Sequence, residues 1–122
     1  MAIASATTEI SSTFNISAAF ASSQGTVTID NPGRAFRILR VVGTGTAACV
    51  IDVKKNNSGG ALAAKVTCDV NNEPMNGVLT TANTDFTAED KVFIDVGTHN
   101  GTQCDILCVA TGGGQTLTNA VT

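Results

Sequence analysis

Three carboxylates, Asp85, Glu89 and Asp90, lie close together directly before an alternating apolar run. Carboxylate oxygens are the ligands that Ca²⁺ prefers, and one ion takes about six to eight oxygens. The three acids do not follow the regular spacing of an EF-hand loop. Asp85 and Thr87 are residue types that cap tight turns through bonds to the backbone, and Phe86 is expected to close one end of the core. We therefore interpret the cluster as the turn that starts a strand, with a calcium site as the alternative.

His99 is the only histidine of the chain and lies in a loop rich in Gly, Asn and Thr. A hydrolytic site needs a nucleophile, a base and an orienting group placed together, and no serine has the surroundings of a nucleophile elbow. The glycine-rich segments 43–48 and 112–114 open no helical pattern, and no Gly-Lys-Ser/Thr follows them, so they are turns rather than phosphate loops. The sequence predicts a protein that is not an enzyme and holds no cofactor.

Four cysteines could bind zinc or form disulfides: Cys49, Cys68, Cys104 and Cys108. Their spacings, 18, 35 and 3 intervening residues, contain no Cys-x₂-Cys pair of the kind found in zinc sites. Cys104 and Cys108 would lie about 13 Å apart on one face of a strand, whereas a disulfide needs Cα atoms within about 7 Å. A bond between Cys49 and Cys68, or between either and a C-terminal cysteine, stays open. Buried free thiols are the favoured interpretation.

The charge content of the 122-residue chain is low, with 14% charged residues and a net charge of −3. Typical soluble domains carry about 25%. The seven cations are too few to follow a phosphate backbone and have no accompanying aromatic ladder, so nucleic acid is not an expected partner. Because a free monomer relies on charge to stay dispersed, the Thr-, Ser-, Ala-, Asn- and Gly-rich surface is either merely weakly charged or, as we favour, covered by other subunits.

Targeting signals are not found in the sequence. Residues 1–17 lack the positive start and the sustained apolar run of a signal peptide, and no stretch approaches the ~20 apolar residues of a membrane span. We expect a chain made in a cytoplasm, where thiols usually stay reduced, with no membrane partner.

Short runs rich in β-branched residues alternate with turn signals, and no helical periodicity appears, which is typical of a sandwich or barrel. About eight strands are expected, at 14–21, 25–30, 35–43, 47–55, 61–70, 75–82, 91–96 and 103–111. The third and fourth are expected to form a hairpin around Gly-Thr-Gly-Thr. We expect an all-β fold, an antiparallel β-sandwich with jelly-roll-like connections.

Three parts of the chain are expected: an N-terminal arm or edge strand (1–24), the sandwich (25–111) and a C-terminal tail (112–122). In the last strands the period of two sorts the side chains into faces: Val92, Ile94 and Val96 share one face of their strand, and Cys104, Ile106, Cys108 and Ala110 share one face of theirs. The opposite face of the last strand carries Asp105, Leu107 and Val109, so both of its faces are largely apolar. One face should meet the core, and the other calls for a second partner, either the arm or a neighbouring subunit.

Contacts with a partner are expected from the arm and from polar loops, because arms can order on docking and loops often carry binding residues. The candidate residues are Phe14 and Phe20 on the arm, and Asn57 and His99 in loops. All five aromatic residues are phenylalanine, and the absence of Trp and Tyr counts against a carbohydrate platform.

The segment "NTDFTAEDKVFIDV" followed by "GTQCDILCVAT" resembles the closing strands of small viral jelly rolls. Together with the low-charge Ser/Thr/Ala-rich start, the chain over residues 25–111 is similar to decoration (cement) and head-fibre proteins of tailed bacteriophages. The resemblance implies a structural protein on the exterior of the virion, often a homotrimer, that contacts the major capsid protein and stabilises the capsid by bridging neighbouring subunits. No functional residue is transferred by it. A fibre or tail tip that recognises a host receptor or glycan is the alternative.

Overall fold

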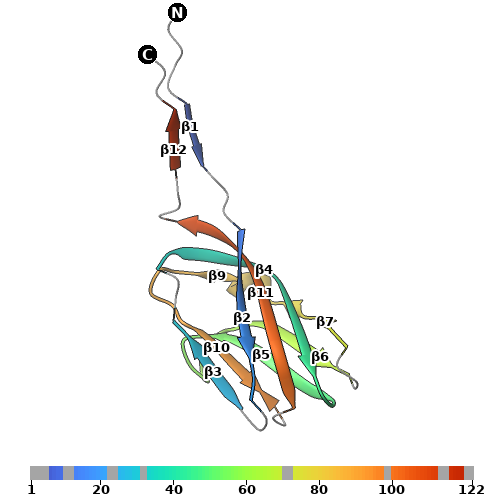
Figure 1. The fold of residues 1–122 in the computed structure, drawn as a ribbon. Helices are drawn as coiled ribbons and strands as arrows, with labels where there is room; N and C mark the ends of the chain where they lie inside the picture. Colours follow the sequence, from blue (N-terminus) through green and yellow to red (C-terminus); the bar gives the residue numbers. More distant parts are fainter. Residues whose placement is uncertain are drawn as a thin grey trace, which may run out of the picture.

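The computed structural model shows two antiparallel β-sheets that pack against each other around one apolar core (Figure 1). The all-β sandwich expected from the sequence is confirmed, and the jelly-roll connectivity stays a prediction. The structure describes residues 6–9, 13–21, 25–30, 33–69, 73–97, 100–112 and 116–119.

The first sheet has the strand order β3-β10-β5-β6-β8. Its strands are β3 Thr26–Ile29, β10 Val92–Val96, β5 Cys49–Lys55, β6 Leu62–Cys68 and β8 Val78–Leu79. The β5–β6 hairpin turns at Asn56, which adopts a left-handed φ of 69°, a conformation that Asn tolerates better than most residues.

The second sheet has the strand order β2-β11-β4-β7, and β9 also pairs with β4. Its strands are β2 Thr13–Ala19, β11 Gly101–Gly112, β4 Ala35–Gly45, β7 Met75–Asn76 and β9 Asp85–Phe86. The segment expected as an arm or edge strand thus supplies β2, an edge strand. Beyond the sandwich, β1 (Ala6–Glu9) pairs with β12 (Thr116–Asn119), so the two described ends of the chain lie together (Figure 1).

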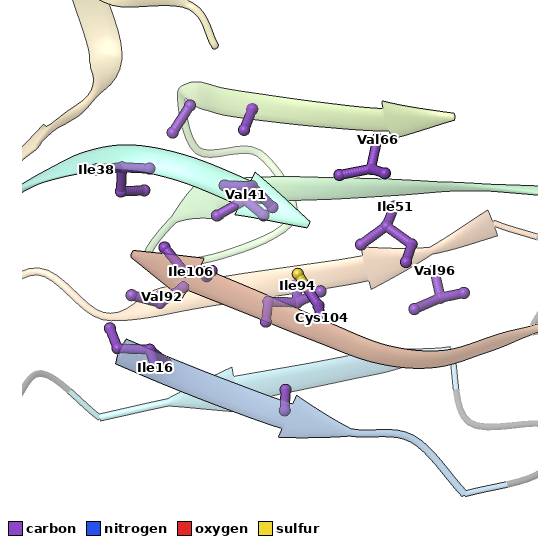
Figure 2. Packing of buried hydrophobic residues seen from close by; sticks show 14 of the residues in the cluster. Ile16, Ile38, Val41, Ile51, Val66, Val92, Ile94, Val96, Cys104 and Ile106 are labelled. Atoms are coloured by element: carbon purple, nitrogen blue, oxygen red, sulfur yellow. The ribbon is translucent and has the colours of Figure 1, made fainter. Parts of the chain in front are cut away.

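Side chains of both sheets form the core, because alternate residues of each strand point inward. The side chains expected to share a face of β10 and of β11 do so, and the structure shows which face is inward: Val92 and Ile94 are fully buried, as are Cys104 and Ile106. Figure 2 shows part of this cluster, with Ile38, Val41 and Ile106 from the second sheet and Ile51, Val66 and Ile94 from the first.

The hairpin expected between residues 35–43 and 47–55 is wrong. β4 pairs with β11, β7 and β9, whereas β5 pairs with β6 and β10. The short segment 46–48 therefore carries the chain from one sheet to the other. A turn signal between two apolar runs cannot distinguish these arrangements, because partner choice depends on residues far away in the sequence.

The single strand expected over residues 75–82 is also wrong. β7 belongs to the second sheet and β8 to the first, and a 3₁₀ turn, η1 (Thr81–Asn83), follows. The chain changes sheets at Gly77, whose N–H donates to the carbonyl of Val41 at 2.7 Å. A Cβ atom at Gly77 would lie 2.8 Å from Cγ2 of Val66, so the crossing requires a residue without a side chain.

Candidate functional site

Asp85, the first of the clustered acids, forms an ion pair between β9 and β4. Nε of Arg37 donates to Oδ1 of Asp85 at 2.7 Å, and Nη2 lies 3.4 Å from Oδ2. The hydrogen bond from Arg37 lowers the pKa of Asp85, and the same bond raises the pKa of Arg37. The expectation that Asp85 caps the turn is therefore wrong, because its carboxylate is bound to a side chain 48 residues away.

Asp90 is the residue that closes the turn. Its Oδ2 accepts a hydrogen bond from the N–H of Thr87 at 2.9 Å, and its Oδ1 accepts one from Nδ2 of Asn56 at 3.0 Å. Oδ1 of Asn56 in turn accepts from the N–H of Lys91 at 2.9 Å. The bond from Thr87 is the main cause that lowers the pKa of Asp90. The turn is thereby tied to the β5–β6 hairpin.

The cluster thus has a structural role. Oγ1 of Thr87 accepts from the N–H of Glu89 at 3.3 Å, as expected for a capping residue. Among the residues that the structure describes, no group of three or more His, Cys, Asp and Glu side chains could hold a metal ion.

Phe86 closes the end of the core, as the sequence predicts. Its ring stacks on Phe36 with the centroids 4.9 Å apart and the planes at 14°. Phe14 meets Phe36 edge to face at 5.7 Å, and Nζ of Lys55 lies 5.3 Å from the centroid of Phe86, within the range of a cation–π contact. The turn and the aromatic cluster therefore hold β9 against the sandwich.

All four cysteines are buried and free, which confirms the interpretation from the sequence. Burial raises the pKa of Cys104 and of Cys108 to about 12, so these two pack as apolar groups. Cys49 and Cys68 lie directly opposite each other on β5 and β6.

Three of the four expected partner contacts, Phe14, Phe20 and Asn57, lie in the described part of the chain. Phe20 is 8% exposed and belongs to the core, so its expected place on a binding surface is corrected. Phe14 packs against the core as well. Asn57 is exposed, and its Oδ1 accepts from the N–H of Gly59 in the β5–β6 turn. His99 lies outside the described residues. Both phenylalanines point inward because β2 joins the sheet.

A mixed apolar and polar surface lies on the outer side of the second sheet; we call it the β11 face. It is formed by Asp105, Leu107 and Val109 of β11 with Leu39 and Val42 of β4, all exposed or half-buried. Leu107 lies opposite Asn15 of β2 and Arg40 of β4.

Asp105 on this face is held by its neighbours. Its Oδ1 accepts from Oγ of Ser17 at 2.7 Å and from Nε2 of Gln103 at 3.1 Å. The carboxylate is therefore already hydrogen-bonded within the surface, and a partner that covers the face need not supply a donor for every oxygen.

Leu39 was not identified from the sequence as a surface residue. The register of β4 against β11 shifts between Ile38 and Arg40, which leaves Leu39 as an extra residue. Such a bulge breaks the alternation, and Leu39 and Arg40 are both exposed, Leu39 by 42%. The signal was present in "FRILRV": the inward residues Phe36, Ile38 and Val41 are spaced by two and then by three.

Comparison with known proteins gives no relative. No protein-family model matches the chain, and searches of curated proteins and of solved structures returned no match. In the described part of the chain there is no helix of sufficient length and apolar character to cross a membrane. Any function must therefore be argued from the chain itself.

Proposed function

We propose that the chain is a non-catalytic structural protein that decorates and stabilises a phage capsid, as a homotrimer that bridges neighbouring capsid subunits on the capsid exterior. The β11 face carries the proposal. It places leucine and valine side chains at the surface of a small sandwich, on a rigid sheet rather than a loop. Exposed apolar side chains grouped on one face are typical of protein interaction sites.

The rim of this face favours a partner that is protein. Thr13, Asn15 and Ser17 of β2 border β11, and each lies directly opposite a β11 residue. Short polar side chains lose less rotamer entropy when covered than Lys or Glu does. Leucine and valine beside arginine, with short polar groups around them, suit an interface with an apolar centre and a polar rim.

The edges of the sheets favour self-association. β2 and β3 each have a neighbour on one side only among the described strands, and an open edge can pair with another chain. A closed ring of three subunits would cover such edges without leaving a further one to extend the assembly. The low formal charge, −3 on 122 residues, opposes this assembly only weakly.

The proposal is tested by sedimentation velocity over a range of protein concentrations and by co-sedimentation with empty capsid shells of the phage that encodes the chain. A trimer that binds the shells is expected. Leu39→Asp and Leu107→Asp should weaken trimer formation or shell binding by at least about tenfold, because each buries a charge in the interface. Val78→Asp is the matched control, since Val78 is 76% exposed and lies on the other sheet.

A chain that stays monomeric at every concentration and leaves the shells unoccupied would overturn the proposal. If such a monomer bound glycans on an array, and Asn57→Ala removed that binding, the alternative of a receptor- or glycan-binding tip would be supported instead. Equal effects of the Val78 and Leu39 variants would remove the β11 face from the proposal.

A further inference from the structure

Cys49 and Cys68 form a pair of thiols at one end of the first sheet. Cys49 is the first residue of β5, Cys68 is the last of β6, and the two are directly opposite in antiparallel register. Opposite residues of this kind have Cα atoms about 4.5–5.5 Å apart, within the roughly 4.4–6.8 Å that disulfides span. Both thiols are free, and besides burial the proximity of Cys49 is one of the causes that raise the pKa of Cys68.

A surface pocket gives access to this pair. The pocket is open, has a volume of about 330 Å³ and is lined by both cysteines together with Ala48, Val50 and Thr67. The cysteines themselves retain little exposure, 5% for Cys49 and 2% for Cys68. Cys104 and Cys108 are fully buried between the sheets and do not line the pocket. Of the four thiols, only this pair meets both requirements of a reaction site, a thiol partner in reach and an approach from solvent.

We propose that Cys49 and Cys68 are a modification site that reacts with a low-molecular-weight disulfide and closes into an intramolecular disulfide between β5 and β6. The thiolate of Cys49, the more exposed residue, attacks one sulfur of the small disulfide; a mixed disulfide forms and one small thiol leaves. The thiolate of Cys68 then attacks the Cys49 sulfur and releases the second small thiol. The chain loses two protons and two electrons, and the small disulfide takes them up as two thiols. This inference does not rest on the proposed function.

The surroundings of the pair make the closure slow rather than forbidden. Burial raises the pKa of Cys68 to about 12, and the neighbouring Cys49 and Asp69 add to the effect. Cys68 is in turn a minor cause of the raised pKa of Cys104, which lies on β11 of the other sheet. Because the thiolate is the reacting form, the pair should stay reduced during brief contact with oxidant at neutral pH and close during prolonged contact under mildly alkaline conditions.

The reaction is tested on the full chain, first reduced and then incubated with glutathione disulfide, alkylated and measured by mass spectrometry. Closure removes two hydrogen atoms without leaving an adduct. Trypsin cleaves after Arg40, Lys54, Lys65 and Lys91, so the expected product joins peptide 41–54 to peptide 66–91. Cys49→Ser should abolish this linked pair, whereas Cys104→Ser, the matched control, should retain it.

The oxidised chain is also expected to melt about 5–10 °C above the reduced chain, because the bridge closes a loop of the unfolded state. A linkage that involves the peptide 92–122 or joins two chains would overturn the proposal. The proposal would also be overturned if all four cysteines of the chain were still free to be alkylated after an incubation that fully oxidises a dithiol peptide. These outcomes are read on the wild-type chain and stay decisive where a serine variant fails to fold. An oxidised form that melts no higher would show that the bridge does not fit the native sheet.

Discussion

Phe86 of β9 stacks on Phe36 of β4 with the ring centroids 4.9 Å apart, and both side chains are almost fully buried. β9 is only two residues long and makes two register pairs with β4. Two backbone pairs cannot by themselves hold a segment against a sheet, since an isolated two-stranded pairing is marginal in water. The buried ring contact therefore contributes most to fixing β9, together with the exposed Arg37–Asp85 ion pair, and with β9 it fixes the turn that leads into β10.

Truncation of this ring should destabilise the fold strongly. Phe86→Leu is expected to lower the free energy of unfolding by about 1–1.5 kcal/mol and Phe86→Ala by about 3–5 kcal/mol, because each leaves a larger cavity against Phe36. Urea unfolding followed by circular dichroism measures the change. Phe93→Leu and Phe93→Ala are the controls, since Phe93 is half-buried on the outer side of β10. Equal losses at the two positions would show that the stacked ring has no special role.

Gly77 and Val66 should be energetically coupled. A Cβ atom at Gly77 would lie 2.8 Å from Cγ2 of Val66 and 3.2 Å from the carbonyl oxygen of Lys65. Gly77→Ala should therefore cost about 1–3 kcal/mol through overpacking. Val66→Ala removes the methyl group in the way, so the double variant should be more stable than the sum of the single effects predicts, by at least about 0.5 kcal/mol.

Gly59→Ala is the control for this coupling. A Cβ atom at Gly59 would meet only Oδ1 of Asn57, at the ordinary contact distance of 3.5 Å. Its effect on unfolding should stay within about 0.5 kcal/mol and add to that of Val66→Ala. If Gly77→Ala is as neutral as Gly59→Ala, the sheet crossing has more room than the distances indicate.

The regular strands could be predicted from the sequence, and the long-range pairings could not. β10 and β11 follow the period of two over most of their length, so the sequence predicts which side chains share a face, but with both faces of β11 largely apolar it does not decide which face is inward. The bulge at Leu39 and the crossings at residues 46–48 and at Gly77 depend on which strand lies beside which. That information resides in contacts between distant residues and has no local signature.

In the candidate site, too, local features could be predicted from the sequence and long-range contacts could not. Phe86 was placed in the core because a lone aromatic in a polar turn needs a buried position. The assignment of Asp85 to the turn is wrong because its actual partner, Arg37, lies 48 residues away, where the local sequence does not reveal it. The inward side of Phe20 follows from the register of β2 with β11, which a Ser/Thr/Ala-rich segment does not reveal.

Asp90 should make the stability of the fold depend on pH in the acid range. Its pKa is lowered in the folded chain, first by the hydrogen bond from the Thr87 backbone. The carboxylate therefore contributes stability that is fully present above its unfolded pKa of about 4 and is lost as the pH falls through the folded value. Asp90→Asn should be less stable than wild type by about 0.5–1 kcal/mol at pH 6, and the two proteins should converge towards pH 2.

Unfolding in urea at a series of pH values measures this convergence. Glu89→Gln is the matched control, because it removes a charge of the same sign from a neighbouring residue. The contact of Glu89 with the turn is made by its backbone N–H, which the substitution retains. Its curve should run parallel to that of wild type. A constant gap between Asp90→Asn and wild type down to pH 2 would contradict the role of the ionised carboxylate.

Asp52 and Asp95 lie directly opposite each other on β5 and β10, on the outer side of the first sheet. Like charges in opposite positions repel, and such pairs change stability by about 0.2–1 kcal/mol. Lys65 of β6 relieves this repulsion only in part, since its Nζ lies 3.9 Å from Oδ1 of Asp52 and that oxygen has no hydrogen-bond partner in the described structure. Asp95→Asn should therefore stabilise the fold.

The expected gain for Asp95→Asn is about 0.5 kcal/mol at low salt, and it should shrink as salt screens the repulsion. Thermal unfolding at low and high ionic strength measures both the gain and its salt dependence. Asp30→Asn is the matched control, because Asp30 lies 3.7 Å from Nζ of Lys91 and faces a cation instead of an acid. That variant should be neutral or slightly less stable. If Asp95→Asn were destabilising, or its effect were the same at both ionic strengths, the facing carboxylates would not be in repulsive contact.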